Sequence, residues 1–353
     1  MKASLNWLLV FFPITLYLNF FRQDLQTWTF ICACLTIIPL AGLMGHATEN
    51  LASKLGEGVG GLLNATFGNA AELIIAIVAL REGMFDVVKA SLTGSIIGNI
   101  LLVLGLSFVC GGARFSVQNF NTTAARNQST MLLLAAAALI MPAVYHFLAT
   151  PQMLPGEKDL SFDISIILIL IYFLSLVFSL KTHAHLFAGE AVEELEGTES
   201  QKTSKALMIL LVSTALVAWV SEMLIGSVEH AAHTFGMSNI FVGVIVVAIV
   251  GNAAEHSSAV LAALKNRMDL SVSIAVGSSV QIALFVAPLL VVISHWIAPQ
   301  SMDLVFTPLE VFSVSLAVLV AGQTAGDGKS NWFEGAQLLS LYAILGVVFY
   351  FMP

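Results

Sequence analysis

Charged side chains are scarce in this chain, and their scarcity excludes one broad class of protein. Only 10% of its 353 residues are Asp, Glu, Lys or Arg, while 58% are hydrophobic. A soluble globular domain has about 25% charged and about 45–50% apolar residues. The composition therefore predicts an all-α integral membrane protein that lies in a lipid bilayer.

Cysteine and the common enzyme motifs are also nearly absent. The three cysteines, Cys32, Cys34 and Cys110, lie inside or at the ends of apolar runs, so they form neither a disulfide framework nor a Cys/His metal signature. No HExxH motif occurs, and the glycine-rich stretch at 57–69 lacks a Walker lysine. The sequence thus predicts neither an enzyme nor a bound cofactor, and its net charge of −8 argues against a nucleic-acid partner.

Long apolar runs are abundant, and they set the expected number of membrane spans. About 20 apolar residues are needed to cross a hydrocarbon core of about 30 Å. We expect the first run to be retained as a helix, because no small-residue cleavage site follows it. The eleven predicted spans are 5–21, 28–44, 61–80, 87–109, 130–149, 162–180, 205–226, 237–264, 270–292, 304–321 and 336–352.

The distribution of lysine and arginine predicts the orientation of these spans. With a cytoplasmic N-terminus, ten of the fourteen Lys and Arg residues fall on the cytoplasmic side, as the positive-inside rule requires. An odd number of spans then places the C-terminus outside.

One motif occurs twice, and its spacing reveals an internal repeat. The residues GNAAE begin at Gly68 and again at Gly251, 183 positions later. At the same spacing, Gly94 aligns with Gly277 and the following serines align with each other, so the next helix is duplicated as well. Two consecutive helices are therefore present in two copies.

The sequences upstream of the motif extend each copy by one helix. ATENL around Glu49 is similar to VSEML around Glu222, which gives five spans in each copy. Five is odd, so the second copy crosses the membrane in the opposite direction, as in many secondary transporters that bind substrate near the midplane. The predicted organisation is an extra N-terminal helix, a first repeat, an acidic cytoplasmic linker and a second, inverted repeat, at residues 1–25, 26–182, 183–204 and 205–353.

Two helices of each repeat carry polar side chains three or four residues apart, so that these side chains lie on one face. They supply carboxylate, amide and hydroxyl oxygens but no thiolate, which is the ligand set of a hard cation such as Ca²⁺. A glutamate at the centre of a bilayer costs at least about 2.5–3.5 kcal/mol on insertion scales, so it is a candidate for function. The predicted metal-binding residues are Glu72, Glu255, Asn69 and Asn252, and the predicted supporting residues are Ser95, Asn99, Ser278 and Gln281.

Several other titratable residues have two interpretations, and the sequence leaves both open. His256 follows Glu255 and has no counterpart in the first copy; it either bonds a neighbouring helix or handles protons near the site. Glu49 and Glu222 either guide cations into the two mouths of a pathway or are solvated helix-end carboxylates. The same choice, between calcium collection or regulation and simple solvation, applies to the linker residues Glu190, Glu193, Glu194, Glu196 and Glu199.

Taken together, these motifs resemble the calcium/proton antiporters of the cation/calcium exchanger superfamily. The resemblance rests on the paired GNAAE motifs, on GSIIGN and GSSVQIALFVAP after them, and on SNWFEGAQLL before the last span, and it covers almost the whole chain. It implies that Glu72 and Glu255 bind Ca²⁺ and H⁺ in turn, that His256 tunes the exchange, and that cytosolic calcium leaves as protons enter. The short chain is similar to a prokaryotic plasma-membrane member of that family rather than to a vacuolar one.

Two other functions are alternatives to this one. An exchanger of sodium for calcium, or of another divalent cation, has a similar fold but is expected to need additional sodium ligands. An intramembrane hydrolase would need a nucleophile and base pair, and Ser257 and Ser258 beside His256 point in different directions on a helix. The sequence leaves open whether the chain forms a homo-oligomer.

Overall fold

The computed structural model describes residues 5–55, 60, 63, 66–184 and 203–352. In these residues the chain is almost entirely helical, as predicted, and it divides into two compact units that are described separately. Unit 1 is formed by Met1–Ser91, Val192–Ala254 and Phe349–Pro353, and unit 2 by Leu92–Ala191 and Glu255–Val348. Each unit contains segments from both predicted repeats.

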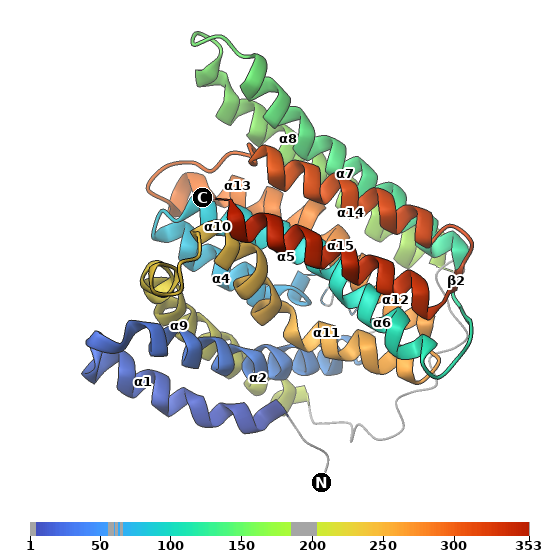
Figure 1. Cartoon of the computed structure of the whole chain (residues 1–353), viewed down its shortest axis with the longest axis horizontal. Helices are drawn as coiled ribbons and strands as arrows, with labels where there is room; N and C mark the ends of the chain where they lie inside the picture. Colours follow the sequence, from blue (N-terminus) through green and yellow to red (C-terminus); the bar gives the residue numbers. More distant parts are fainter. Residues whose placement is uncertain (1–4, 56–59, 61–62, 64–65, 185–202, 353) are drawn as a thin grey trace. The chain divides into compact units, whose positions relative to one another are not determined.

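Most elements of unit 1 come from the start and the middle of the chain (Figure 1), and the last residues of α15 (Trp332–Phe351) also belong to it. The label η denotes a short 3-10 or π-helical segment. In chain order the elements are η1 (Leu5–Val10), α1 (Phe11–Phe21), η2 (Gln23–Leu25), α2 (Gln26–Ala52), α4 (Ala70–Arg81), the first half of α5 (Phe85–Ile97), α9 (Thr203–Phe235), α10 (Asn239–Phe241), η7 (Val242–Val247) and the first half of α11 (Ala248–Leu264).

Unit 2 contains the second halves of α5 and α11 and most of the remaining helices. The others are η3 (Gly98–Val103), α6 (Leu104–Gly112), α7 (Thr122–Leu148), η4 (Leu154–Gly156), α8 (Glu157–Val177), η5 (Phe178–Thr182), α12 (Met268–Gln281), η8 (Ile282–Val286), α13 (Ala287–Ile297), α14 (Pro308–Thr324) and α15 (Trp332–Phe351). Two short strands, β1 (Gln118–Asn119) and β2 (Lys329–Ser330), pair antiparallel, with Gln118 opposite Ser330.

Eight of the described helical segments are long and apolar enough to cross a membrane. They coincide with eight of the predicted spans, and two shorter apolar helices, Leu5–Phe21 and Pro308–Thr324, coincide with two more. The predicted span 61–80 includes residues outside the described part of the chain, and its described portion is α4. The structure thus bears out a helical membrane protein, while the count of eleven spans stays a prediction.

Helix boundaries follow local chemistry. Asn121 caps α7 by accepting a hydrogen bond from the backbone N–H of Ala124, which satisfies one of the donors that a helix start leaves without an intrahelical partner. Gly83 and Gly236 follow the ends of α4 and α9 with φ of 75° and 65°. Glycine adopts this left-handed conformation at little cost, so it ends both helices.

Unit 1 is held together by α2 and α9, which pack along their lengths. The Thr15 hydroxyl of α1 lies 3.3 Å from that of Thr36 on α2, and the Phe12 ring packs edge-on against Trp219 of α9. A Cβ atom at Gly243 would lie only 2.7 Å from Cβ of Ala90. The absence of a side chain there allows η7 to pack directly on α5.

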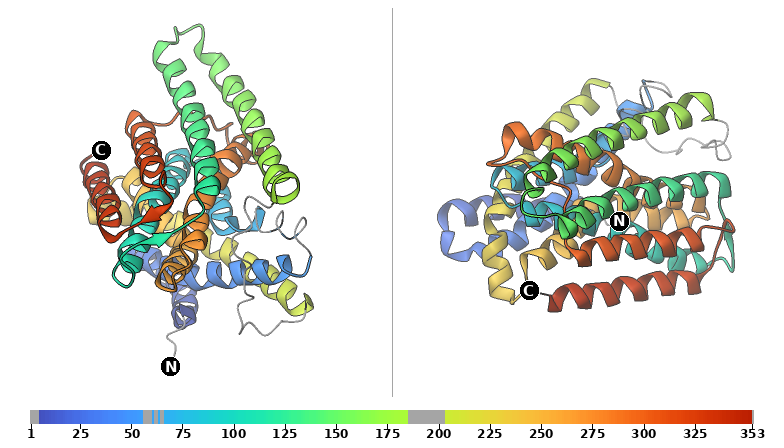
Figure 2. Two further views of the ribbon diagram at one scale, coloured as in Figure 1. Left: turned by 90° about the vertical axis from the view of Figure 1, so that its right-hand side faces the viewer. Right: turned by 90° about the horizontal axis from the view of Figure 1, so that it is seen from above.

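Unit 2 has a helical hairpin and a closely packed pair of helices. Helices α7 and α8 form this hairpin (Figure 1), and the two helices diverge with distance from their connection (Figure 2). Helices α6 and α15 meet at two glycines: a Cβ atom at Gly335 would lie 2.6 Å from the carbonyl oxygen of Gly105 and 2.6 Å from the backbone nitrogen of Val109. Backbone therefore packs on backbone at this crossing.

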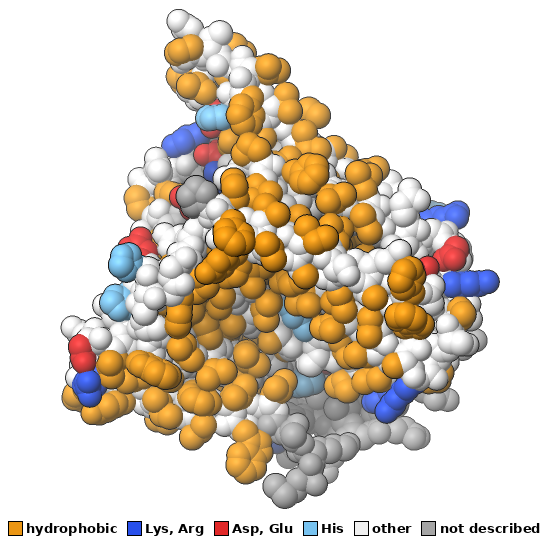
Figure 3. All heavy atoms as spheres, viewed as in Figure 1, with side chains coloured by type: hydrophobic (Ala, Val, Ile, Leu, Met, Phe, Trp, Pro, Cys, Tyr) orange, Lys and Arg blue, Asp and Glu red, His pale blue; other side chains and the backbone are white. Residues whose placement is uncertain are grey.

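Large apolar side chains are exposed along the hairpin. Hydrophobic side chains gather over α7 and α8 (Figure 3), and Leu134, Phe147, Ile167 and Leu174 are among those exposed. Because lipid tails are as apolar as these side chains, exposed hydrophobic residues are the expected surface of a membrane-spanning helix.

We predict that Gly335→Ala destabilises the protein. The added methyl group meets backbone atoms that cannot turn aside, and overpacking of this kind costs about 1–3 kcal/mol. The matched control is Gly322→Ala in α14, where nothing lies within 4 Å of the added Cβ. Thermal unfolding in detergent should give a lower Tm for the first variant only; equal Tm values would contradict the close packing of α6 on α15.

Candidate functional site

The two GNAAE motifs have different backbone conformations. In the first copy Gly68 and Asn69 form a turn, α4 begins at Ala70, and Glu72 lies in its first turn. A carboxylate is favoured there because the start of a helix carries partial positive charge. In the second copy α11 runs through the whole motif without a break. The sequence predicted that Asn and Glu of each motif lie on one face of a helix. In the first copy, however, Asn69 occupies the position before α4 and not a place within it.

Within unit 1 the two motifs meet. The Glu72 side chain lies against Gly251, where a Cβ atom would be 3.3 Å from Cγ and 3.5 Å from Oε1 of the glutamate. The neighbouring Asn252 is fully buried and donates a hydrogen bond from Nδ2 to the carbonyl oxygen of Ala248, at 2.9 Å. The glycine of one motif therefore makes room for the carboxylate of the other.

Unit 2 joins the second helices of the two repeats in a corresponding way. Asn99 donates from Nδ2 to Oγ of Ser278 at 3.1 Å, and both residues are buried. Ser95, four residues before Asn99, is 4% exposed. The predicted supporting residues of the two repeats thus include one direct contact between the helices that carry them.

A π-helical segment occurs at the same place in both repeats. The backbone N–H of Leu104 bonds to the carbonyl of Asn99, and that of Ala287 bonds to the carbonyl of Ile282, five residues back in each case. These positions are related by the repeat spacing of 183. Such π-segments are uncommon and often lie at functional sites. The sequence does not predict them, because a shift of one residue in the backbone hydrogen bonding leaves no recognisable residue pattern.

The remaining predicted site residues are placed on their helices, but not all are brought together. Glu255 and His256 lie on α11, where both are half-buried and Oε2 of the glutamate is buried. Glu72 belongs to unit 1 and Glu255 to unit 2. The convergence of the two carboxylates stays a prediction, as do the roles of His256 and of the half-buried Gln281.

The other acidic candidates are less buried or lie outside the described chain. Oε2 of Glu49 is 3.5 Å from Nδ1 of His46, with both side chains largely exposed, and Glu222 is exposed on α9. Among the described residues no three His, Cys, Asp or Glu side chains form a metal-binding group. The linker residues Glu190, Glu193, Glu194, Glu196 and Glu199 lie outside the described residues.

Comparison with known proteins identifies the family. The model of a family described as sodium/calcium exchanger protein matches residues 25–181 and 205–351. The chain belongs to the sodium/calcium exchanger family. It is therefore a membrane transporter and not an enzyme.

Relatives from two bacteria match nearly the whole chain. The chain is 46% identical to a Ca(2+)/H(+) antiporter of Synechocystis sp., over 98% of this chain and 96% of the relative. It is 48% identical to the Ca(2+)/H(+) antiporter ChaA of Bacillus subtilis, over 92% of each. The family match thus extends over both predicted repeats and across the motifs described above.

Solved structures match the fold as well. Native YfkE has a TM-score of 0.86 and 42% identity, with 99% of this chain and all of the other covered. An H+/Ca2+ exchanger named CAX has a TM-score of 0.75 over 98% of this chain and 90% of its own. At 15% identity the second likeness shows a shared fold and nothing further.

We predict that Gly251→Val reduces ion exchange, because the added methyl groups occupy the space now filled by the Glu72 side chain. Uptake by vesicles that contain equal amounts of protein should fall at least about 10-fold, since small displacements of a binding group have large effects on rate. The control is Gly226→Val on α9, where nothing lies within 4 Å of a Cβ. Wild-type exchange by the Gly251 variant would show that this contact is not part of the site.

Proposed function

We propose that the chain is a secondary active antiporter that exports cytosolic Ca²⁺ in exchange for H⁺. The observation that carries this proposal is the contact of Glu72 with Gly251, because it joins the two copies of the GNAAE motif. The near full-length identity to proteins named Ca(2+)/H(+) antiporter supports the choice of ions. The chain needs no cofactor for this activity, since calcium is its substrate.

We propose further that the chain has eleven transmembrane helices, one extra helix followed by two inverted repeats of five. The equivalent π-segments support this layout, as do the family matches at 25–181 and 205–351, whose limits lie close to the predicted repeats 26–182 and 205–353. In this layout the N-terminus and the acidic linker at 183–204 are cytoplasmic and the C-terminus is outside. The bacterial relatives favour a prokaryotic plasma membrane.

The calcium site in this proposal combines one carboxylate and one amide from each repeat. Glu72 and Glu255 supply the negative charge that offsets desolvation of the ion, and Asn69 and Asn252 add neutral oxygen ligands. The supporting residues Ser95, Asn99, Ser278 and Gln281 hold the helices and complete the polar lining. The contact between Asn99 and Ser278 supports this division of roles.

Exchange follows from competition for the same two carboxylates. Calcium binds to them only when they are ionised, and protonation removes the charges that the ion requires. An empty site with two bare carboxylates is costly in a medium of low dielectric constant. The transporter therefore changes sides either with calcium bound or with both acids protonated, which couples the two fluxes. His256 tunes the proton side of this cycle.

Other acidic residues have roles outside the central site. Glu49 and Glu222 attract cations to the two mouths of the pathway, and both side chains are exposed on their helices. The five linker glutamates either collect calcium at the cytoplasmic face or only solvate the connection. A homo-oligomer is compatible with this function but is not required for it.

The alternative is exchange of sodium for calcium, as the family description names it. Sodium exchange would require sodium-binding residues in addition to the carboxylate pair. Calcium uptake into inverted vesicles, driven by an imposed pH gradient with and without sodium, separates the two. Uptake that needs sodium and ignores the pH gradient would replace the proposed function by this alternative.

We predict that Glu72→Gln and Glu255→Gln each abolish calcium transport while the protein still inserts into the membrane. Glutamine has nearly the same shape but no charge, so the site can no longer offset the charge of the ion. Radioactive calcium uptake should fall to the background of empty vesicles. Exchange near the wild-type rate in either variant would rule out a site made of both carboxylates.

We also predict that calcium binding weakens as pH falls and that it releases protons. Calorimetry in buffers of different ionisation enthalpy counts the protons released for each calcium bound. His256→Leu, which copies Leu73 of the first motif, should shift the pH dependence of transport and leave calcium binding at high pH unchanged. A proton count of zero across the pH range of transport would exclude competition.

A further inference from the structure

Glu310 is a buried carboxylate in unit 2 that the proposed exchange cycle does not use. It lies in the first turn of α14 and is only 2% exposed. An ionisable side chain within an apolar helix is expensive and is a functional candidate by default. Its contacts therefore indicate what it does.

Two kinds of contact hold this carboxylate. Oε2 accepts hydrogen bonds from the backbone N–H and the hydroxyl of Thr307, at 2.9 and 2.8 Å, and Oγ1 of Thr307 accepts one from the backbone N–H of Glu310. This reciprocal pattern is a capping box that starts the helix. Oε1 accepts a hydrogen bond from Oγ1 of Thr93 on α5, at 3.3 Å. Capping needs only the first set, so the bond to Thr93 requires another explanation.

The start of α14 is itself firmly anchored by the segment before it, which we call the strap (Met302–Thr307). Met302, Leu304 and Phe306 are buried, and they alternate with more exposed residues as in an extended chain. The backbone N–H of Met302 bonds to Oγ of Ser294 on α13 at 2.8 Å, and that of Leu304 bonds to Oγ of Ser161 on α8 at 3.0 Å.

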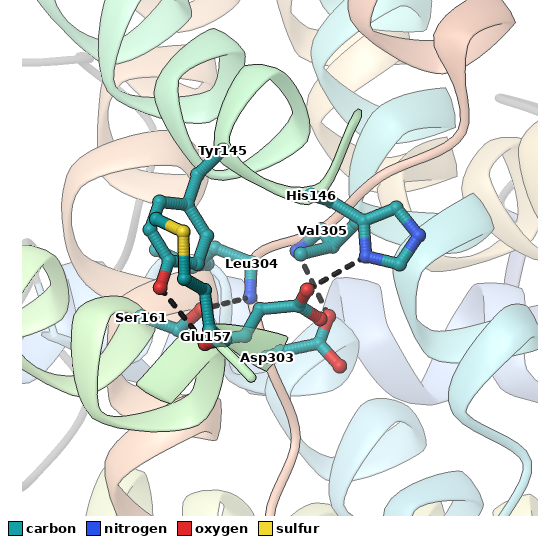
Figure 4. A network of polar contacts seen from close by, with 8 residues as sticks. Tyr145, His146, Glu157, Ser161, Asp303, Leu304 and Val305 are labelled. Carbon is teal, nitrogen blue, oxygen red and sulfur yellow. Dashed lines mark hydrogen bonds and ion pairs between the residues drawn. The ribbon is translucent and has the colours of Figure 1, made fainter. Parts of the chain in front are cut away.

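Figure 4 shows the strap beside α8, with Leu304 directed at Ser161 and His146 at Glu157. Nδ1 of His146 lies 2.6 Å from Oε2 of Glu157, and this contact joins the end of α7 to the start of α8. Because the strap is tied to two other helices, the Glu310 carboxylate has a fixed position from which to hold α5.

Thr93 is two residues before Ser95 and six before Asn99, and all three are buried. A directional bond at Thr93 fixes the rotation of this part of α5 about its axis, which apolar packing alone does not do. Rotation decides whether the Asn99 amide reaches Ser278 on α12. The bond to Glu310 therefore acts on the geometry of the proposed site from outside it.

The other repeat has a related contact. Gln128 on α7 lies over Gly277 on α12, with Nε2 3.6 Å from the position of a Cβ. Gly277 is the repeat equivalent of Gly94, next to Thr93, and Gln128 is one residue beyond the equivalent of Glu310. In both cases a long polar side chain, Glu310 or Gln128, reaches a helical turn of a neighbouring helix. That turn contains a glycine, Gly94 or Gly277, and the next residue is a predicted supporting serine.

We propose that Glu310 is a positioning residue for transport: through Thr93 it sets the rotation of α5 and so holds Ser95 and Asn99 at the cation site. This role rests on the proposed function. The sequence indicates the capping role of Glu310, because Thr307 and Glu310 form a T-x-x-E pattern. It does not indicate the bond to Thr93, which is 217 residues away.

The test compares Thr93→Val, Glu310→Ala and their double variant in calcium uptake driven by a pH gradient. Each single variant should raise the calcium concentration for half-maximal uptake by roughly 5-fold, the equilibrium value of one ordinary buried hydrogen bond, with little change in maximal rate. The double variant should show the same calcium concentration for half-maximal uptake as the single variants, because each substitution removes the same hydrogen bond. Glu310→Gln should restore near wild-type uptake, since its amide keeps partners for both threonines.

Two matched controls separate positioning from general damage. Thr307→Val weakens the cap of α14 but leaves the Thr93 hydroxyl facing Glu310. Thr36→Val removes another fully buried threonine hydroxyl, which bonds to the carbonyl of Cys32 in unit 1. Both are expected to lower the Tm in detergent and to leave half-saturation within about twofold of the wild type.

Three results would overturn the proposal. An unchanged calcium concentration for half-maximal uptake in Thr93→Val would show that the hydrogen bond between Thr93 and Glu310 does not act on the site. A Thr307→Val variant as impaired as Glu310→Ala would reduce Glu310 to a helix cap. A Glu310→Gln variant as impaired as Glu310→Ala would show that the charge itself is needed. If the wild type shows no uptake at all, the proposed function fails first, and this result is distinguishable because it does not depend on any variant.

Discussion

The structure depends on one constraint, which is that a hydrocarbon core offers no water to polar groups. In the described part of the chain, most buried hydroxyls satisfy this constraint within their own helix: Thr36 donates to the carbonyl of Cys32, and Ser213 to that of Ile209. Such local bonds do not depend on how the helix packs against its neighbours. Hydrogen bonds that join different helices are fewer, and they fix how those helices pack against each other.

The bonds from Asn99 to Ser278 and from Thr93 to Glu310 are of this second kind. Both involve the stretch of α5 and η3 that carries the polar face of the first repeat, and both link it to helices of the second repeat. In a chain whose packing is mostly apolar, directional contacts of this kind define the rotation of a helix. The proposed cation site needs several oxygen ligands at set positions, and a fixed helix rotation would provide them.

Glycine has two uses in the same framework. At Gly335 and Gly243 the missing side chain lets one backbone approach another, which serves packing alone. At Gly251 it accommodates a carboxylate instead. The two GNAAE copies also show that identical residues adopt different backbones, a helix start in one case and an uninterrupted helix in the other. The surroundings, and not the motif, decide which is formed.

The sequence by itself determined the membrane class, the positions of the apolar helices, the spacing of 183 and the family, because composition, periodicity and repetition are local or countable properties. Tertiary structure alone decided that Glu72 lies on Gly251, that Asn99 bonds to Ser278, and that the Glu310 cap reaches Thr93. It also decided the π-segments, which differ from an α-helix by one residue in the hydrogen-bond register. Contacts between residues about 180 or more positions apart depend on how helices pack, and no local pattern encodes that packing.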